Sequence, residues 1–316
     1  MSYQPLLRVS GLHVTFDLGN SSVKAVDGVD LEIRQSETLG LIGESGSGKS
    51  ILGLSILKLL PPNAEVNGEV WFGGTNLAGS SEEDIRKIRG REIAWIPQDP
   101  ATSFNPVLKI GFQIAEPMVL HMSLDKIQAR QKAMELLQFF DIQPAGERAD
   151  QYPHQYSGGM RQRALVAMGT STRPKLLIAD EPTKGVDNFR KNQVAFMFRK
   201  VKNENKELSI LLITHDLPFA QALCDRIAVM YCGQIVEISS AEVFFKAPLH
   251  PYGKALLESL PARGMKNIPG DIPSMINPPG GCRFHPRCRY ARAWCRDAEP
   301  PLSKINGSMV RCWQCA

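Results

Sequence analysis

The sequence predicts an α/β fold around a mostly parallel sheet, and two observations indicate it. Segments typical of strands alternate with segments typical of helices along the 316 residues. Two aliphatic runs, "PKLLIAD" (174–180) and "ELSILLITHD" (207–216), end in acidic or polar residues, as buried central strands do. With 43% hydrophobic residues, the chain has the apolar material for such a buried sheet.

The N-terminal elements follow from periodicity. "LLRVSGLHVTF" (6–16) alternates apolar and polar residues, which predicts strands of an N-terminal antiparallel β-subdomain. "KSILGLSILKLL" (49–60) has helical spacing until Pro61 and Pro62 end it. "REIAWIPQ" (91–98) is a further predicted strand.

Later elements complete the alternation. Residues 110–140 are predicted to be helical, with apolar stripes in "KIQARQKAMELLQFF". "RIAVMYCGQIVEI" (226–238) predicts a strand pair that turns at Gly233.

Composition changes after about residue 260, where aliphatic residues thin out. Eight of the 22 prolines lie between 261 and 301, so a different kind of segment begins there. We therefore predict one large domain over residues 1–245 and a small Cys-rich C-terminal module over 246–316.

Charge and hydropathy exclude several classes of protein. A net charge of +5 is mild for a nucleic-acid-binding protein, so no nucleic-acid partner is expected. The N-terminus lacks the basic and apolar segments of a signal peptide, and no apolar run approaches the ~20 residues of a membrane span. We expect a cytosolic chain that reaches a membrane only through a partner.

The clearest motif is "GESGSGKS" (43–50), which fits G-x-x-x-x-G-K-[S/T] between a predicted strand and a predicted helix. Its glycines allow the backbone N–H groups to face phosphate oxygens, and the helix start adds a positive dipole end. Lys49 is expected to bind the β- and γ-phosphates and Ser50 to ligate Mg²⁺. The predicted phosphate-binding set is Gly43, Glu44, Ser45, Gly46, Ser47, Gly48, Lys49 and Ser50. By itself the motif indicates an NTPase, and a small-molecule kinase or a GTPase fits equally well.

Acidic and polar residues at two strand ends narrow the chemistry. Asp180 is expected to hold Mg²⁺ through water, and Glu181 to orient and polarise the attacking water. His215 follows the next aliphatic strand and can donate to the γ-phosphate. Because ligands bind at the carboxyl ends of such strands, these residues belong to the predicted site.

A second candidate phosphate site lies in "YSGGMRQR" (156–163). Ser157 is predicted to cap a helix, while Gly158 and Gly159 leave backbone N–H groups bare at its start. Two phosphate sites on one chain suggest that ATP binds between the glycine loop of one subunit and this segment of another. An ordinary helix cap is the alternative.

Taken together, these motifs resemble the ATP-binding subunits of ABC transporters, in the family's order. The resemblance covers residues 6–245 and implies a P-loop NTPase (RecA-like) fold with an inserted helical subdomain over about 99–160. It also implies that Gln98 senses Mg²⁺ and water, that Phe16 stacks on adenine and that Asp187 contacts a partner subunit. "KGVD" (184–187) departs from the family's usual segment, but no catalytic position changes, so ATP hydrolysis is expected.

Four further stretches resemble the oligopeptide, dipeptide and nickel importer branch. They are "IPQDPATSFNP" (96–106), "YPHQYSGGMRQR" (152–163), "HPYGKALLESLP" (250–261) and "GCRFHPRCRYA" (281–291). The resemblance implies a second, related ATPase chain (a heterodimer, with a homodimer as the alternative), two membrane permease subunits and an external binding protein. It places the chain peripherally on the cytoplasmic face of the inner membrane. Peptide is the expected cargo and a nickel or metal-chelate complex the alternative.

Two other functions fit the sequence less well. A soluble ABC-type ATPase acting on nucleic acid or ribosomes usually carries coiled-coil insertions or two ATPase units, and neither is evident. A non-hydrolysing regulatory relative is disfavoured by the presence of Glu181 and His215.

The cysteines form a separate pattern. In a reducing compartment, seven cysteines indicate metal binding or buried thiols rather than disulfides. Four of them are separated by five, six and sixteen residues, a spacing wider than that of most zinc sites. A small module needs a staple, and four thiolates can hold an iron–sulfur cluster. The predicted ligands are Cys282, Cys288, Cys295 and Cys312, with Cys315 as a substitute.

The family resemblance favours a [4Fe–4S] cluster of structural role for these ligands. Zinc and unligated thiols remain the alternatives. Cys224 and Cys232 lie in the ATPase core and are expected to be buried small hydrophobes.

Overall fold

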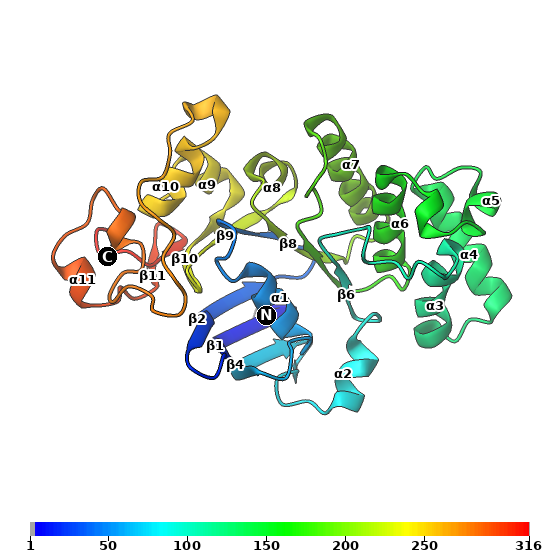
Figure 1. Cartoon of the computed structure of the whole chain (residues 1–316), viewed down its shortest axis with the longest axis horizontal. Helices are drawn as coiled ribbons and strands as arrows, with labels where there is room; N and C mark the ends of the chain where they lie inside the picture. Colours follow the sequence, from blue (N-terminus) through cyan, green and yellow to red (C-terminus); the bar gives the residue numbers. More distant parts are fainter. Residues whose placement is uncertain (1–3, 316) are drawn as a thin grey trace. The chain divides into compact units, whose positions relative to one another are not determined.

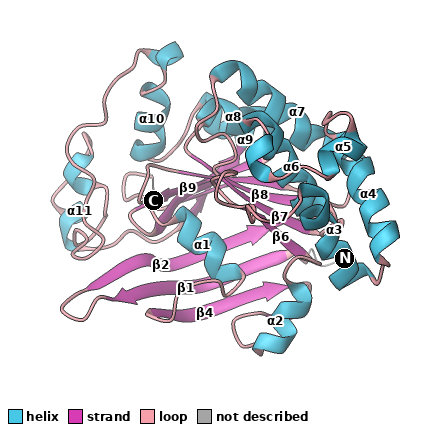
Figure 2. Ribbon diagram, turned by 45° about the vertical axis from the view of Figure 1, so that its right-hand side comes forward, coloured by secondary structure: helices cyan, strands magenta, loops and turns pink. Residues whose placement is uncertain are grey.

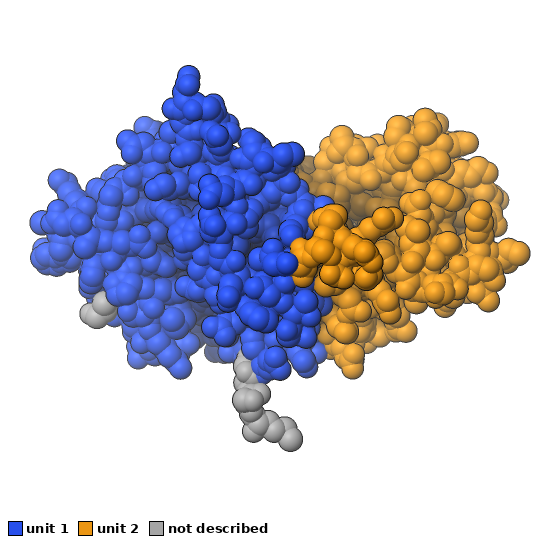
Figure 3. All heavy atoms as spheres, turned by 90° about the horizontal axis from the view of Figure 1, so that it is seen from below, with its two compact units in different colours: residues 1–79, 213–316 blue, residues 80–212 orange. Residues whose placement is uncertain are grey.

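A computed structural model describes residues 4–315, except the side chains of residues 188 and 189. The chain divides into two compact units (Figure 3). Unit 1 comprises residues 1–79 and 213–316, and unit 2 comprises residues 80–212. The segment 246–316 thus belongs to the same unit as the N-terminal strands, while the predicted boundary near residue 245 stays a prediction.

Four strands of unit 1 form an antiparallel sheet in the order β2-β1-β4-β5 (Figures 1 and 2). They are β1 (Leu7–Asp17), β2 (Ser22–Ile33), β4 (Ala64–Phe72) and β5 (Thr75–Asn76). Alternate apolar residues of β1, among them Leu7, Val9 and Leu12, are buried. The predicted N-terminal antiparallel β-subdomain is confirmed.

A second group of strands in unit 1 carries the phosphate loop. Strand β3 (Thr38–Ile42) is fully buried and pairs in parallel with β9 (Arg226–Tyr231). Strand β10 (Gln234–Ser240) returns antiparallel to β9 after a turn at Cys232 and Gly233, where both φ angles are positive. The predicted strand pair is confirmed.

The C-terminal segment adds strands to this group. Strand β12 (Ser308–Val310) pairs with β10, with Val310 opposite Glu237, and β11 (Ser303–Ile305) pairs with β12. The end of the chain is therefore part of the sheet that contains β3.

The helices of unit 1 are short. Helix α1 is α-helical only to Ile56, whereas the pattern predicted helix to residue 60, because the last turn tightens and Lys58 adopts a left-handed φ of 51°. The helices are α1 (Lys49–Ile56), α8 (Leu217–Leu223), α9 (Ala241–Lys246), α10 (Pro251–Glu258) and α11 (Trp294–Asp297), with 3₁₀ turns at Pro261–Arg263 and His285–Arg287.

Unit 2 combines three strands, in the order β8-β7-β6, with six helices. The strands are β6 (Ile93–Ile96), β7 (Leu176–Asp180) and β8 (Ser209–Thr214), within which the two units divide after Leu212. The helices are α2 (Glu82–Ile88), α3 (Ile110–Met122), α4 (Lys126–Phe139), α5 (Ala145–Ala149), α6 (Gly158–Thr170) and α7 (Asn188–Glu204).

The stretch predicted to be helical over 110–140 consists of α3 and α4. Ser123 takes a left-handed φ of 55°, and Asp125 caps α4 by accepting the N–H groups of Ile127 and Gln128. Helices α3 to α5 lie within the predicted helical subdomain, 99–160 (Figure 1). None of the described helices is long and apolar enough to cross a bilayer.

Candidate functional site

The phosphate loop of unit 1 lies between β3 and α1 and packs against two neighbouring strands. A Cβ atom on Gly43 would lie 2.2 Å from the carbonyl oxygen of Met230, and one on Gly48 would lie 2.1 Å from that of Ala25. Gly48 also has a φ of 102°, which side chains disfavour. The loop therefore needs glycine at both positions.

Lys49 is buried within the curl of this loop. Its Nζ donates to the carbonyl oxygens of Gly43 at 2.9 Å and Glu44 at 2.8 Å, and to Ser47 Oγ at 3.3 Å. No side chain caps the N-terminus of α1. The ammonium group and the helix dipole thus place positive charge where the sequence predicts phosphates.

The other predicted residues of unit 1 occupy separate positions. Ser50 is the second residue of α1 and is half-buried, and Phe16 is half-buried near the end of β1. His215 is exposed, directly after β8.

In unit 2, two parallel strands bring Gln98 and the acidic pair to one sheet edge. Ile96 of β6 pairs with Ala179 of β7, so Gln98 and Glu181 each lie two residues beyond a paired position. Asp180 and Glu181 are 5% and 6% exposed. Glu181 has a φ of 46°, a left-handed conformation that is rare outside glycine and is often found at functional sites.

Ser157 is the N-cap of α6, as its position predicts, and its hydroxyl accepts the N–H of Met160 at 3.3 Å. Ser157 and Gly158 are exposed. Gln162, which the sequence reasoning did not select, donates from Nε2 to the carbonyl of Pro182 and so links α6 to the segment after Glu181.

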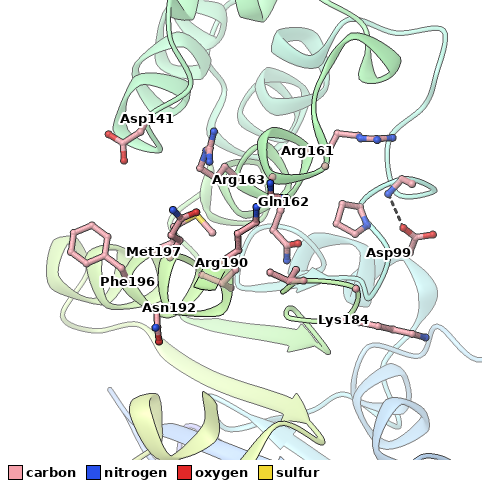
Figure 4. A pocket seen from close by; sticks show the side chains of 18 residues that line it. Asp99, Asp141, Arg161, Gln162, Arg163, Lys184, Arg190, Asn192, Phe196 and Met197 are labelled. Carbon is pink, nitrogen blue, oxygen red and sulfur yellow. Dashed lines mark hydrogen bonds between the residues drawn. The ribbon is translucent and has the colours of Figure 1, made fainter. Parts of the chain in front are cut away.

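Asp187 caps α7 by accepting the N–H of Arg190 at 3.0 Å, and their side chains form an ion pair at 3.3 Å. A cavity of about 680 Å³ lies within unit 2, between the starts of α6 and α7 (Figure 4). Gly158 and Gly159 line it.

Basic residues outnumber acidic ones in the lining of this cavity. Its charged residues are Arg161, Arg163, Lys184, Arg190, Asp99 and Asp141. The Nε atoms of Arg161 and Arg163 are buried without a hydrogen-bond partner among the described residues. The cavity therefore suits an anionic ligand. In the sequence, the two arginines of "MRQR" and the unusual Lys184 are the signals that could have indicated this basic cavity.

Four of the five cysteines of the C-terminal segment line a small cavity together with His250 and Phe284. They are Cys282, Cys288, Cys295 and Cys312. Burial, and then the neighbouring thiols, raise the pKa of Cys282 to about 11. Burial likewise raises the pKa of Cys315 to about 11 and that of Cys288. Cys224 and Cys232 are buried, as predicted.

The predicted metal centre, [4Fe–4S] or zinc, is not shown by this arrangement. Within residues 4–315, no group of three or more His, Cys, Asp or Glu side chains is placed to hold a metal ion. Metal ligation needs thiolates, so a metal bound here would displace the protons of these thiols.

Protein contacts also hold this segment in place. Phe284 is 2% exposed and packs on Tyr231 and Tyr252, with ring centroids 5.2 and 5.3 Å away. Together with the strand pairing of β12, this aromatic cluster attaches the segment to the core of unit 1.

Comparison with known proteins identifies the family. The ABC transporter family matches residues 26–184, and the C-terminal region of oligopeptide/dipeptide transporters matches residues 236–295. The chain belongs to the ABC transporter ATP-binding proteins. This match confirms the predicted resemblance and the ATPase class, and the chain is an ATP-hydrolysing subunit of this family.

Two relatives match nearly the whole chain. The oligopeptide transport ATP-binding protein AppD of Bacillus subtilis is 43% identical over 316 residues, covering 98% of this chain and 96% of its own. The oligopeptide transport ATP-binding protein OppD of Escherichia coli is 39% identical over 311 residues, covering 97% and 92%.

Solved structures show the same fold. The dimeric ATP-binding cassette MJ0796 bound to ADP and Pi has a TM-score of 0.67 at 24% identity, covering 74% of this chain and 98% of its own. A second dimeric structure of MJ0796 has a TM-score of 0.65 at 23% identity. The predicted P-loop NTPase fold of the cassette is therefore confirmed. The Cys-rich C-terminal module is not confirmed by these matches.

Proposed function

We propose that this ABC ATPase powers the uptake of peptides through partner membrane subunits. One observation carries the proposal: relatives named for oligopeptide transport match over nearly the full length of both chains, C-terminal region included. The alternative cargo, a nickel or metal-chelate complex, has no such support.

The residues fit a nucleotide. The curled loop with Lys49 at its centre would hold the β- and γ-phosphates, and Phe16 would stack on adenine. Ser50, Gln98 and Asp180 would hold Mg²⁺, which neutralises phosphate charge when bound. The other predicted residues of the site would contact ATP or the attacking water.

Glu181 would orient the attacking water and His215 would contact the γ-phosphate. The tip of α6 (exposed Ser157 and Gly158 with half-buried Gly159), beside the basic cavity of unit 2, would bind the ATP of a second subunit. Asp187 would contact that subunit.

The partners follow from this composite site. The chain would pair with a second, related ATP-binding subunit and bind two membrane permease subunits, with an external binding protein delivering peptide to them. It would sit peripherally on the cytoplasmic face of the inner membrane. The mild charge of +5 disfavours the rival function on nucleic acid or ribosomes.

The test is peptide uptake into proteoliposomes that contain the chain with its membrane and ATPase partners. Glu181→Gln should leave ATP binding intact but reduce turnover and uptake more than about 100-fold, because water is no longer activated. Glu83→Gln, on the exposed face of α2, is the matched control. Undiminished turnover by the Glu181 variant, or uptake without peptide preference, contradicts the proposal.

We also propose that the four cysteines of the C-terminal cavity take up an iron–sulfur cluster. The support is that four cysteines, Cys282, Cys288, Cys295 and Cys312, line one cavity. Protein purified anaerobically should be brown, with about four irons per chain. Colourless protein, with zinc or without metal, contradicts this proposal.

A further inference from the structure

Glu44, the second residue of the phosphate loop, is held in three directions within unit 1. Its N–H donates to Tyr252 Oη at 2.9 Å, and its carbonyl accepts from Lys49 Nζ at 2.8 Å. Its carboxylate accepts two hydrogen bonds from the guanidinium of Arg287, at 2.7 and 3.1 Å. Glu44 thus connects the lysine of the phosphate loop to residues more than 200 positions later in the chain.

Arg287 is itself fixed. It is 5% exposed, its Nε donates to the carbonyl of Pro269 at 3.0 Å, and its guanidinium lies 5.8 Å from the ring centre of Tyr231. A planar guanidinium held in this way presents two parallel N–H groups in one orientation, which a carboxylate matches. The position of the Glu44 side chain is therefore set by the C-terminal segment.

The turn that carries Arg287 is anchored at a second point. Arg283, 7% exposed, donates to the carbonyl of Cys232 and to the carboxylate of Asp27 on β2. Strands β2 and β9 are the ones against which Gly48 and Gly43 pack. One turn, residues 282–288, therefore contacts both the loop and the strand that supports it.

We propose that Arg287 is a positioning residue for ATP binding, acting through Glu44 on the phosphate loop and Lys49. The C-terminal segment then sets the affinity for nucleotide as well as completing the sheet. The inference rests on the proposed assignment of the loop as the phosphate site.

The experiment measures ATP affinity of the full chain by equilibrium binding, with thermal unfolding in parallel. Arg287→Gln should weaken ATP binding about tenfold, because an unpaired Glu44 no longer holds the loop. Arg289→Gln is the matched control, since exposed Arg289 lies two residues away and pairs with half-buried Glu258 at 2.9 Å rather than with Glu44. It should bind ATP as the parent does.

A role through Glu44 is separated from a merely structural role by the double variant. In a Glu44→Gln background, Arg287→Gln should change ATP affinity less than about twofold, because the partner is already gone. Arg287→Lys should recover affinity only in part, because an ammonium cannot form the paired hydrogen bonds. An equal loss in both backgrounds, or a lower melting temperature with unchanged affinity, overturns the inference.

Lys49→Ala separates this inference from the proposed function. If Lys49→Ala binds ATP as the parent does, the phosphate site itself is wrong. If Lys49→Ala loses binding while Arg287→Gln matches the Arg289 control, only the inference fails. Should Arg287→Gln not fold, parent-like affinity in both Glu44→Gln and Arg287→Lys overturns it.

Discussion

Acidification from pH 7 to pH 5 should destabilise unit 1 through a single buried histidine. His250 is 1% exposed and is the N-cap of α10, where its Nδ1 accepts the N–H of Tyr252 at 3.0 Å. That hydrogen bond requires an unprotonated Nδ1, and burial lowers the pKa of His250 from 6.5 to about 3. The folded protein therefore contains a neutral ring.

The sign and size of this change in stability follow from the difference in the pKa of His250 between the folded and unfolded chain. Because the folded pKa is depressed, the stabilising contribution is complete above pH 6.5 and is lost as the pH falls from 6.5 toward about 3. At pH 5 the unfolded chain binds the proton and the folded chain does not. The cost between pH 7 and pH 5 is about 2 kcal/mol.

The assay is urea unfolding of the full chain at both pH values. His250→Asn keeps a side-chain oxygen for the helix cap but does not titrate, so its loss of stability on acidification should be about 2 kcal/mol smaller than the parent's. The same substitution at exposed His154 controls for the exchange itself. An identical pH dependence in the parent and in His250→Asn would refute the reasoning.

Three further predictions follow from local geometry. Phe284→Ala should lower the free energy of unfolding by about 3–5 kcal/mol, because a buried ring is lost, and denaturant titration measures it; a loss below 1 kcal/mol contradicts the aromatic cluster. Gly48→Ala should abolish ATP binding in an equilibrium assay, since its Cβ would overlap the carbonyl of Ala25; parent-like affinity argues against the loop geometry. Ser157→Ala should cost about 1 kcal/mol by removing the cap on the N–H of Met160, and in the assembled transporter it should also lower ATPase activity; unchanged unfolding would show that the cap is dispensable.

Much of the nucleotide site was predictable because its signals are contiguous. Eight successive residues specify the phosphate loop, and an aliphatic run that ends in Asp180 specifies a strand and the edge where it stops. Ser157 before two glycines specifies a helix start. Each of these three features depends on residues that are close together in the sequence, so local conformational preferences are enough to predict it. Helix ends were less predictable: α1 stops at Ile56 because its last turn tightens, before the prolines act.

Tertiary structure alone decided what surrounds the loop. Arg287 and Glu44 are 243 positions apart, and the sequence around neither residue indicates that the two side chains pair. The pairing of Val310 with Glu237, which adds the end of the chain to the sheet, carries no short-range signal either. Such contacts depend on the path of the whole backbone. A buried ion pair or a strand pairing of this kind forms only when the folded core brings distant segments together.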